Sequence, residues 1–145
     1  MPYTNTRRGI YVTNSTGGTI KHGIPAIVAG VGGVAIKQKP RSWSEGLAVA
    51  DQIDDGEVFF LQAHGEVQVG TASGEAANGL TLSVGTKVYI AAASTTDGVT
   101  TYALSTSSSG NTYFGRVTET PTSPTVNSTV RVPANKVRID LDLKA

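Results

Sequence analysis

One stretch near the end of the chain constrains the fold more than any other feature. Over residues 136–143 apolar and charged side chains alternate strictly, with Val137, Ile139, Leu141 and Leu143 in one set and Lys136, Arg138, Asp140 and Asp142 in the other. Because successive side chains of a strand point to opposite sides, this period of two predicts a strand with one buried and one wet face. Such strands are typical of antiparallel sheets.

The composition indicates the same fold class. The 145 residues include 19 Thr and 12 Ser, and β-branched residues suit a pleated, half-buried surface. The length suits one domain that can bury a real core. We therefore predict an all-β fold, a compact antiparallel β-barrel or sandwich with at most one short helix. Residues 1–20 are predicted to form an extended N-terminal arm, and residues 21–145 a single β domain.

Further strands are predicted where apolar runs lie between turn residues. They cover residues 24–30, 31–36, 57–63, 66–69, 86–90, 99–104 and 113–117, with Gly30 to Gly33 as the tight connection between the first two. Asp97-Gly98 is the strongest hairpin signal, because Gly readily adopts the positive φ that such turns need. Residues 42–50 fit a short helix or a strand, and the pattern leaves both open.

The net charge of +1 conceals a marked asymmetry along the chain. Residues 1–44 carry six basic side chains and no acid, whereas residues 45–75 carry seven acids and no base. Two interpretations remain open: the two regions meet within one subunit, or one of them meets another subunit or an acidic partner. The basic residues are too dispersed, and the aromatic residues too few, to favour nucleic acid as a partner.

The sequence offers little for catalysis or cofactor binding. The chain has no Cys, and its two histidines, His22 and His64, lie far apart, with no Gly-x-Ser-x-Gly motif. No catalytic residue, metal site, cofactor or small-molecule substrate is predicted, and an enzyme is the least expected class. No apolar run approaches the roughly 20 residues that span a bilayer, and the N-terminus lacks the apolar core of a secretion signal. We expect no membrane partner.

Four short motifs, in this order, resemble the small Gly-rich capsid decoration (cement) proteins of tailed bacteriophages. The pieces are His22-Gly23-Ile24-Pro25 leading to Gly32-Gly33-Val34-Ala35, Gly56-Glu57-Val58 with Gly65-Glu66-Val67-Gln68-Val69, Leu82-Ser83-Val84-Gly85-Thr86-Lys87-Val88-Tyr89, and Phe114-Gly115-Arg116-Val117 before the C-terminal strand. Together they span roughly residues 20–143. The chain departs from the family pattern at residues 37–55, which look like an insertion, and in its longer polar N-terminal arm.

The resemblance implies a structural virion protein without catalytic chemistry. Such a protein is made in the host cytoplasm, forms a homotrimer, binds the major capsid protein on the outer surface of the shell, and stabilises the shell by bridging neighbouring capsomers. Avidity would multiply its many weak contacts. The capsid-contact residues expected on this basis are Tyr3, Arg7, Arg8, Tyr11 and Lys21. The oligomer-contact residues expected are Trp43, Glu45, Asp54 and Asp55.

Two other classes of binding protein compete with this interpretation. One is a β module of a phage tail or fibre, which differs from a cement protein in location and copy number. The other is a carbohydrate-binding module, which would need exposed aromatic residues. The pool for that role consists of Trp43, Tyr89, Tyr102 and Tyr113.

Overall fold

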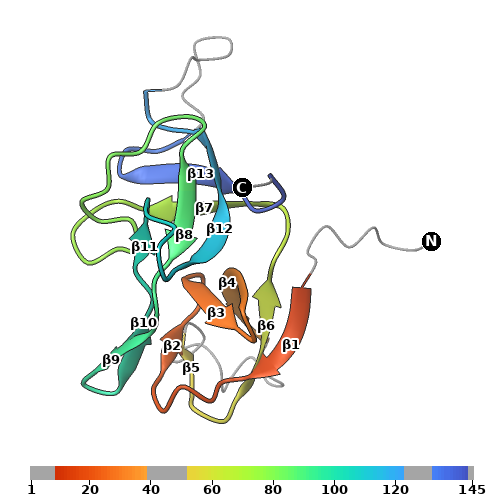
Figure 1. Ribbon diagram of the computed structural model, residues 1–145. Helices are drawn as coiled ribbons and strands as arrows, with labels where there is room; N and C mark the ends of the chain where they lie inside the picture. The colour runs from red at the N-terminus through yellow and green to blue at the C-terminus, as the bar shows by residue number, and fades with distance from the viewer. Residues whose placement is uncertain (1–8, 39–51, 123–131, 144–145) are drawn as a thin grey trace.

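The computed structural model describes residues 9–38, 52–122 and 132–143 (Figure 1). These residues form strands, turns and loops without a helix, so the all-β prediction is confirmed. No helix in these ranges is long and apolar enough to cross a membrane. Residues 42–50, for which helix and strand were both open, lie outside the described ranges.

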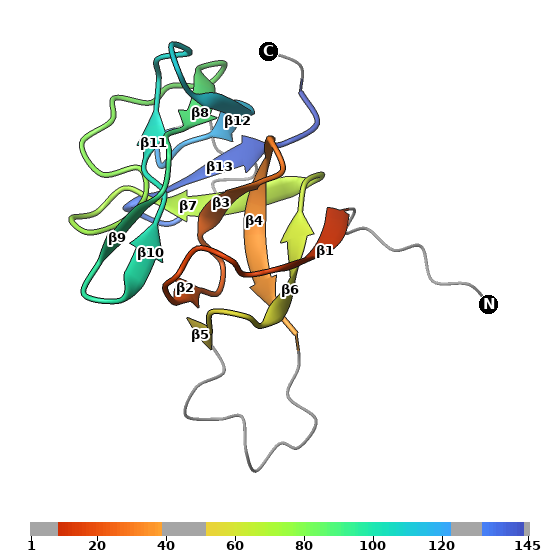
Figure 2. The ribbon, with the colours of Figure 1, turned by 60° about the horizontal axis from the view of Figure 1, so that its bottom comes forward.

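Two antiparallel sheets make up most of the fold, and they lie at opposite ends of the molecule in Figure 1. The first sheet has the order β1-β6-β4-β3. Its strands are β1 (Gly9–Thr13), β3 (Pro25–Val28), β4 (Val31–Lys37) and β6 (Val58–Gln62). This sheet curls, as the view from below in Figure 2 shows.

The second sheet has the order β11-β8-β12-β13-β7. Its strands are β7 (Glu66–Gly70), β8 (Lys87–Ile90), β11 (Leu104–Ser105), β12 (Thr112–Glu119) and β13 (Lys136–Asp140). The expected alternation in β13 holds for Val137 and Ile139, which are 3% and 0% exposed. It continues one residue past the end of the strand at Asp140, since Leu141 is 8% exposed, and it fails only at Leu143, which was predicted to share the buried face and is 41% exposed.

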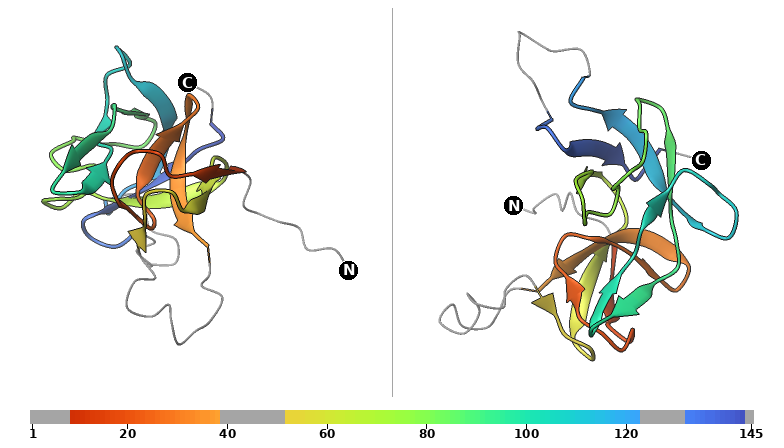
Figure 3. Two further views of the ribbon diagram at one scale, coloured as in Figure 1. Left: turned by 90° about the horizontal axis from the view of Figure 1, so that it is seen from below. Right: turned by 90° about the vertical axis from the view of Figure 1, so that its left-hand side faces the viewer.

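Two short pairs complete the structure. They are β2 (Ile20–Lys21) with β5 (Gln52–Ile53), and β9 (Ser94–Thr96) with β10 (Val99–Thr101). The predicted Asp97-Gly98 hairpin turn is confirmed, with φ of 53° and 76° at its two residues. Figure 3 shows this hairpin projecting along the side of the first sheet.

The turn between β3 and β4 is shorter than expected. Only Ala29 and Gly30 form it, both with positive φ, and Gly32 and Gly33 belong to β4 itself. A Cβ at Gly33 would lie 2.4 Å from the carbonyl oxygen of Gln62 on β6. Gly33 therefore permits the close approach of β4 to its neighbour rather than the turn.

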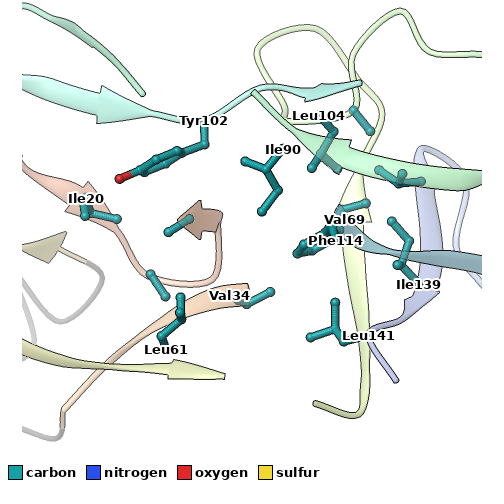
Figure 4. Packing of buried hydrophobic residues seen from close by; sticks show 14 of the residues in the cluster. Ile20, Val34, Leu61, Val69, Ile90, Tyr102, Leu104, Phe114, Ile139 and Leu141 are labelled. Carbon is teal, nitrogen blue, oxygen red and sulfur yellow. The ribbon is translucent and has the colours of Figure 1, made fainter. Parts of the chain in front are cut away.

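A single hydrophobic core joins the two sheets. Figure 4 shows Val34 of the first sheet pointing toward Phe114 and Leu141 of the second part of the molecule, whereas Leu61 lies on the side of Ile20. Ile20 of β2 and Tyr102, which follows β10, close the core at its other end. Since residues from both sheets share one cluster, neither sheet has a separate core.

The predicted arm of residues 1–20 requires correction over residues 9–20, which belong to the domain. β1 pairs with β6 along its whole length, and Ile20 is 1% exposed. Asn14, also 1% exposed, donates from Nδ2 to the carbonyl oxygens of Gly18 at 2.9 Å and Ile53 at 3.1 Å. A buried amide with its hydrogen bonds satisfied fixes a loop firmly, and polar composition alone conceals this. Residues 1–8 lie outside the described ranges.

Candidate interaction surface

An exposed apolar surface lies on the first sheet where β1, β6 and β4 run side by side. Tyr11, Phe60 and Ile36 are in register across these strands, so their side chains share one face. The rings of Tyr11 and Phe60 meet edge to face with centroids 5.1 Å apart. With Val58, the next outward residue of β6, these three form what we call the apolar surface. Tyr11 is 68% exposed and Val58 48% exposed.

This surface lies in a sheet almost free of charge. β1, β3 and β6 contain no charged residue, and β4 contains only Lys37. Lys37 lies in register with Phe59, so its side chain is on the same face of the sheet as the buried Phe59 ring. This face is opposite to the apolar surface. The Nζ atom of Lys37 lies 2.8 Å from Oε2 of Glu57, with the two side chains 12% and 29% exposed. The one charge of the sheet is thus held by a partner, away from the apolar surface.

The predicted capsid-contact residues do not all gather here. Tyr11 is the most exposed residue of the apolar surface. Lys21 is exposed on β2 and lines a separate pocket of about 380 Å³ together with Glu75, Tyr102 and Lys136. The other three predicted capsid contacts (Tyr3, Arg7 and Arg8) lie outside the described ranges.

The predicted oligomer contacts Asp54 and Asp55 form the turn that leads into β6. Oδ1 of Asp55 accepts a hydrogen bond from the backbone N–H of Gly17 at 3.0 Å. The N–H of Asp54 donates to Oε1 of Glu57 at 3.1 Å, and the carbonyl oxygen of Glu57 accepts from the N–H of Asn14 at 2.8 Å. These bonds place three carboxylates at the Thr13 end of β1. Trp43 and Glu45 lie outside the described residues.

The ion pair between Lys37 and Glu57 bears on the charge asymmetry along the sequence. It joins the basic first region to the acidic second region within one chain. Lys21, the other described base of the first region, makes no ion pair with a described residue. The ion pair of Lys37 therefore supports the interpretation in which the two regions meet inside one subunit. The other basic side chains of residues 1–44 give no support to it.

The two histidines are engaged in different parts of the molecule. Nδ1 of His22 accepts a hydrogen bond from the backbone N–H of Lys37 at 3.0 Å. Nδ1 of His64 lies 2.7 Å from Oδ1 of Asp142, and this pair ties the β6–β7 connection to the segment after β13. Within the described ranges no group of three or more His, Asp or Glu side chains is arranged to hold a metal ion.

The tyrosines considered for sugar binding are split between two environments. Tyr102 is 5% exposed in the core, and its burial raises the pKa of its phenol above the ordinary value. Tyr89 and Tyr113 are half-buried on the outward face of the second sheet, with ring centroids 5.6 Å apart. Burial also raises the pKa of Tyr113, while the nearby Arg116 guanidinium opposes this shift. Tyr102 is therefore not available as a stacking platform.

Sequence reasoning missed Phe60, Val58 and Ile36 as surface residues. The run from Val58 to Leu61 is entirely apolar, so its alternation between buried and exposed positions is invisible in the residue types. The signal that could have identified the outward set is the pairing of β6 with β1. Because Tyr11 lies opposite Phe60, the two side chains share one face of the sheet.

Comparison of the chain with protein-family models, curated proteins and solved structures finds no match.

Proposed function

We propose that this protein is a structural virion component, a capsid decoration protein that binds the outer surface of an assembled shell and stabilises it by bridging neighbouring capsomers. Its partners would be the major capsid protein and further copies of itself, in groups of three as the sequence resemblance implies. It would act through contact area alone, without a cofactor or a chemical step.

The observation that carries this proposal is the apolar surface, formed by the exposed Tyr11 and Val58 with the half-buried Ile36 and Phe60, on a sheet with one charged residue. Large exposed apolar residues that lie together on a folded domain are typical of protein–protein contact sites. Aromatic residues are enriched in such contacts, whereas Lys, Glu and Asp are depleted. In chain order, the motifs behind the resemblance fall on β3 with β4, on the start of β6 with β7, on β8 and on β12.

The test mixes the purified protein with undecorated capsids assembled from the major capsid protein of a tailed bacteriophage, and sediments the capsids. We expect saturable co-sedimentation at a fixed ratio to the capsid protein. Tyr11→Lys, which puts a charge on the apolar surface, should weaken binding at least tenfold, because a desolvated charge without a partner is costly. Val84→Lys is the matched control, since Val84 is 58% exposed away from this surface and should bind as the wild type does.

Two results would contradict the proposal. If the wild-type protein stays in the supernatant at saturating concentration, it does not bind the shell, and the tail or fibre module becomes the better interpretation. If Tyr11→Lys and Val84→Lys bind equally well, shell binding does not use the apolar surface. Light scattering on the free protein measures the number of copies independently, and a mass other than a multiple of three subunits would remove the trimer.

A further inference from the structure

The outer edge of β1 differs from the other three edges of the two sheets. β11 has only two residues, and β7 carries Glu66 and Gln68. β3 begins with Pro25, and the carbonyl of Ile27 accepts a hydrogen bond from the hydroxyl of Tyr102 at 3.5 Å. Short length, charge, proline and cover are the features by which proteins prevent pairing at an edge. β1, with the sequence Gly-Ile-Tyr-Val-Thr, has five residues without charge or proline, and no described residue hydrogen-bonds to its outer edge.

The hydrogen bonds to β6 determine which backbone groups of β1 point to this open edge. The N–H of Asn14 donates to the carbonyl of Glu57 at 2.8 Å, so residue 14 faces β6. In an antiparallel ladder, positions that bond to one neighbour alternate with positions that face away. Following the register back from Asn14, Val12 and Ile10 bond to β6, whereas Thr13, Tyr11 and Gly9 present their N–H and C=O groups outward. The outward set is symmetric about Tyr11.

We propose that β1 pairs antiparallel with β1 of a second copy of this chain, about a two-fold axis beside Tyr11. Tyr11 would then exchange two hydrogen bonds with the same residue of the second copy, and each Gly9 would exchange two with the opposite Thr13. Because the outward groups of β1 are symmetric about Tyr11, two copies of the strand can pair so that each outward N–H faces an outward C=O of the other copy. This pairing needs no shift in register. The two first sheets would become one continuous sheet.

Charge complementarity supports a second copy as the occupant of this edge. Arg7 and Arg8 directly precede Gly9 in the sequence. The carboxylates of Asp54, Asp55 and Glu57 lie at the other end of β1, beside Asn14 and Gly17. Antiparallel pairing sets the Gly9 end of each copy against the Thr13 end of the other. The end of β1 that two basic residues precede in the sequence thereby meets the end beside the acids of the partner, twice over by symmetry.

This contact is independent of shell binding, and it adds to the proposed function. The two-fold axis is perpendicular to the sheet, so the apolar surfaces of both copies face the same side and adjoin at Tyr11. A trimer held by other contacts keeps three free β1 edges, and pairing through them gives assemblies with an even number of subunits.

The test uses the absence of Cys from the chain, which makes any introduced Cys the only thiol. Directly opposite residues of a hydrogen-bonded antiparallel pair have Cα atoms about 5.5 Å apart, within the range that a disulfide bridges. Tyr11→Cys should therefore form a covalent dimer rapidly under mild oxidation. Thr13→Cys is the matched control on the same strand and face. Its two thiols would lie four residues apart along the strands, roughly 13 Å, and should not link.

A Tyr11→Cys variant that links no faster than Thr13→Cys overturns the proposal. Capsid binding is measured on the wild-type protein, because Tyr11 belongs to the apolar surface and its loss weakens binding on either account. A Tyr11→Cys variant that links, beside a wild type that does not sediment with capsids, leaves the strand pairing standing and removes the proposed function. A wild type that binds capsids, beside a Tyr11→Cys variant that does not link, has the opposite meaning. The two proposals can therefore fail separately.

A second pair of variants measures the backbone contribution without a new thiol. Tyr11→Pro removes an outward N–H while leaving the bonds of Ile10 and Val12 to β6, so an edge position tolerates it. Tyr11→Thr removes the ring and keeps the N–H. By sedimentation equilibrium the wild type should form an even-numbered state, and Tyr11→Pro should associate at least tenfold more weakly than Tyr11→Thr. Equal association of the two variants, or an odd-numbered or monomeric wild type, would contradict the pairing.

Discussion

The two sheets of this protein differ most in the faces they turn to solvent. The strands of the first sheet contain one charged residue, Lys37, whereas those of the second contain seven. On the second sheet Arg138 lies 3.2 Å from Oε1 of Glu119 and 3.7 Å from Oε2 of Glu66. The outward face of the first sheet instead carries the apolar surface. One sheet is thus suited to remain in water and the other to be covered.

The first sheet is not bare along its whole length. Gly32 and Val34 share a face with Ile36 in β4, yet Val34 is 5% exposed because the second sheet packs over that end. The cover thins out along the strand: Ile36 is half-buried and still packs against the core, Phe60 is half-buried, and Tyr11 on the edge strand is exposed. The apolar surface is therefore the part of a core-like face that the second sheet does not fully cover, and this explains why its residues resemble core residues.

The largest expected effect separates two neighbouring phenylalanines on opposite faces of β6. Phe59 is 1% exposed, and Phe59→Ala should lower the free energy of unfolding by about 3–5 kcal/mol, because it removes a large buried ring and leaves a cavity. Phe60→Ala, on the apolar surface, should cost less than about half of that. Urea unfolding at low protein concentration measures both. Equal losses would show that the face of Phe60 is as fully covered as that of Phe59.

Gly32 marks the place where the covered end of the first sheet meets the second. A Cβ there would lie 2.8 Å from the carbonyl oxygen of Tyr113 and 3.1 Å from Cδ1 of Ile90. Gly32→Ala should therefore force the sheets apart and lower the stability by about 1–3 kcal/mol. Val31→Ala, at the adjacent position that is 40% exposed, is the control and should change little. A neutral Gly32→Ala would argue against this packing of the sheets.

Removal of the central charge on the second sheet should have a smaller effect. Arg138→Met keeps an apolar stem and loses both ion pairs, one of them to Glu119, whose side chain is 16% exposed. We expect a loss of about 1 kcal/mol that shrinks at high salt. Lys87→Met, at an exposed position without an ion pair to a described residue, should leave the unfolding curve unchanged at any salt concentration. A salt-independent loss for Arg138→Met would mean that packing, not charge, holds this face.

The smallest effect concerns Tyr102 in the core between the sheets. Its burial raises the pKa of the phenol in the folded state, so folding disfavours the ionised form. The stability is then constant below the unfolded pKa of about 10 and falls as pH rises through the folded value. Tyr102→Phe should be close to neutral at pH 7, since its hydrogen bond to Ile27 is 3.5 Å long, and should lose less stability between pH 9 and pH 11. An unchanged alkaline loss would assign that loss to other groups.

Local patterns predicted the strands well and their environment less well. The Asp97-Gly98 turn, the β3–β4 pair, the separate strands β6 and β7, and the alternation of Val137 and Ile139 are all present. The arm is wrong over residues 9–20, because the polar Asn14 that suggested a solvated terminus is buried and bonded. Of the nine predicted contact residues, four are described, and only Tyr11 lies on the apolar surface.

The sequence by itself determined where most strands of the two sheets and the Asp97-Gly98 turn lie, because period-two alternation and turn residues act within a few positions of the chain. Only the tertiary structure decided which face of an all-apolar strand is covered. Phe59 and Phe60 have the same side chain, and their difference arises from what packs on each side of β6. That depends on the distance the second sheet extends over the first, and on β1 lying at an edge. Both are long-range arrangements, and no local pattern encodes them.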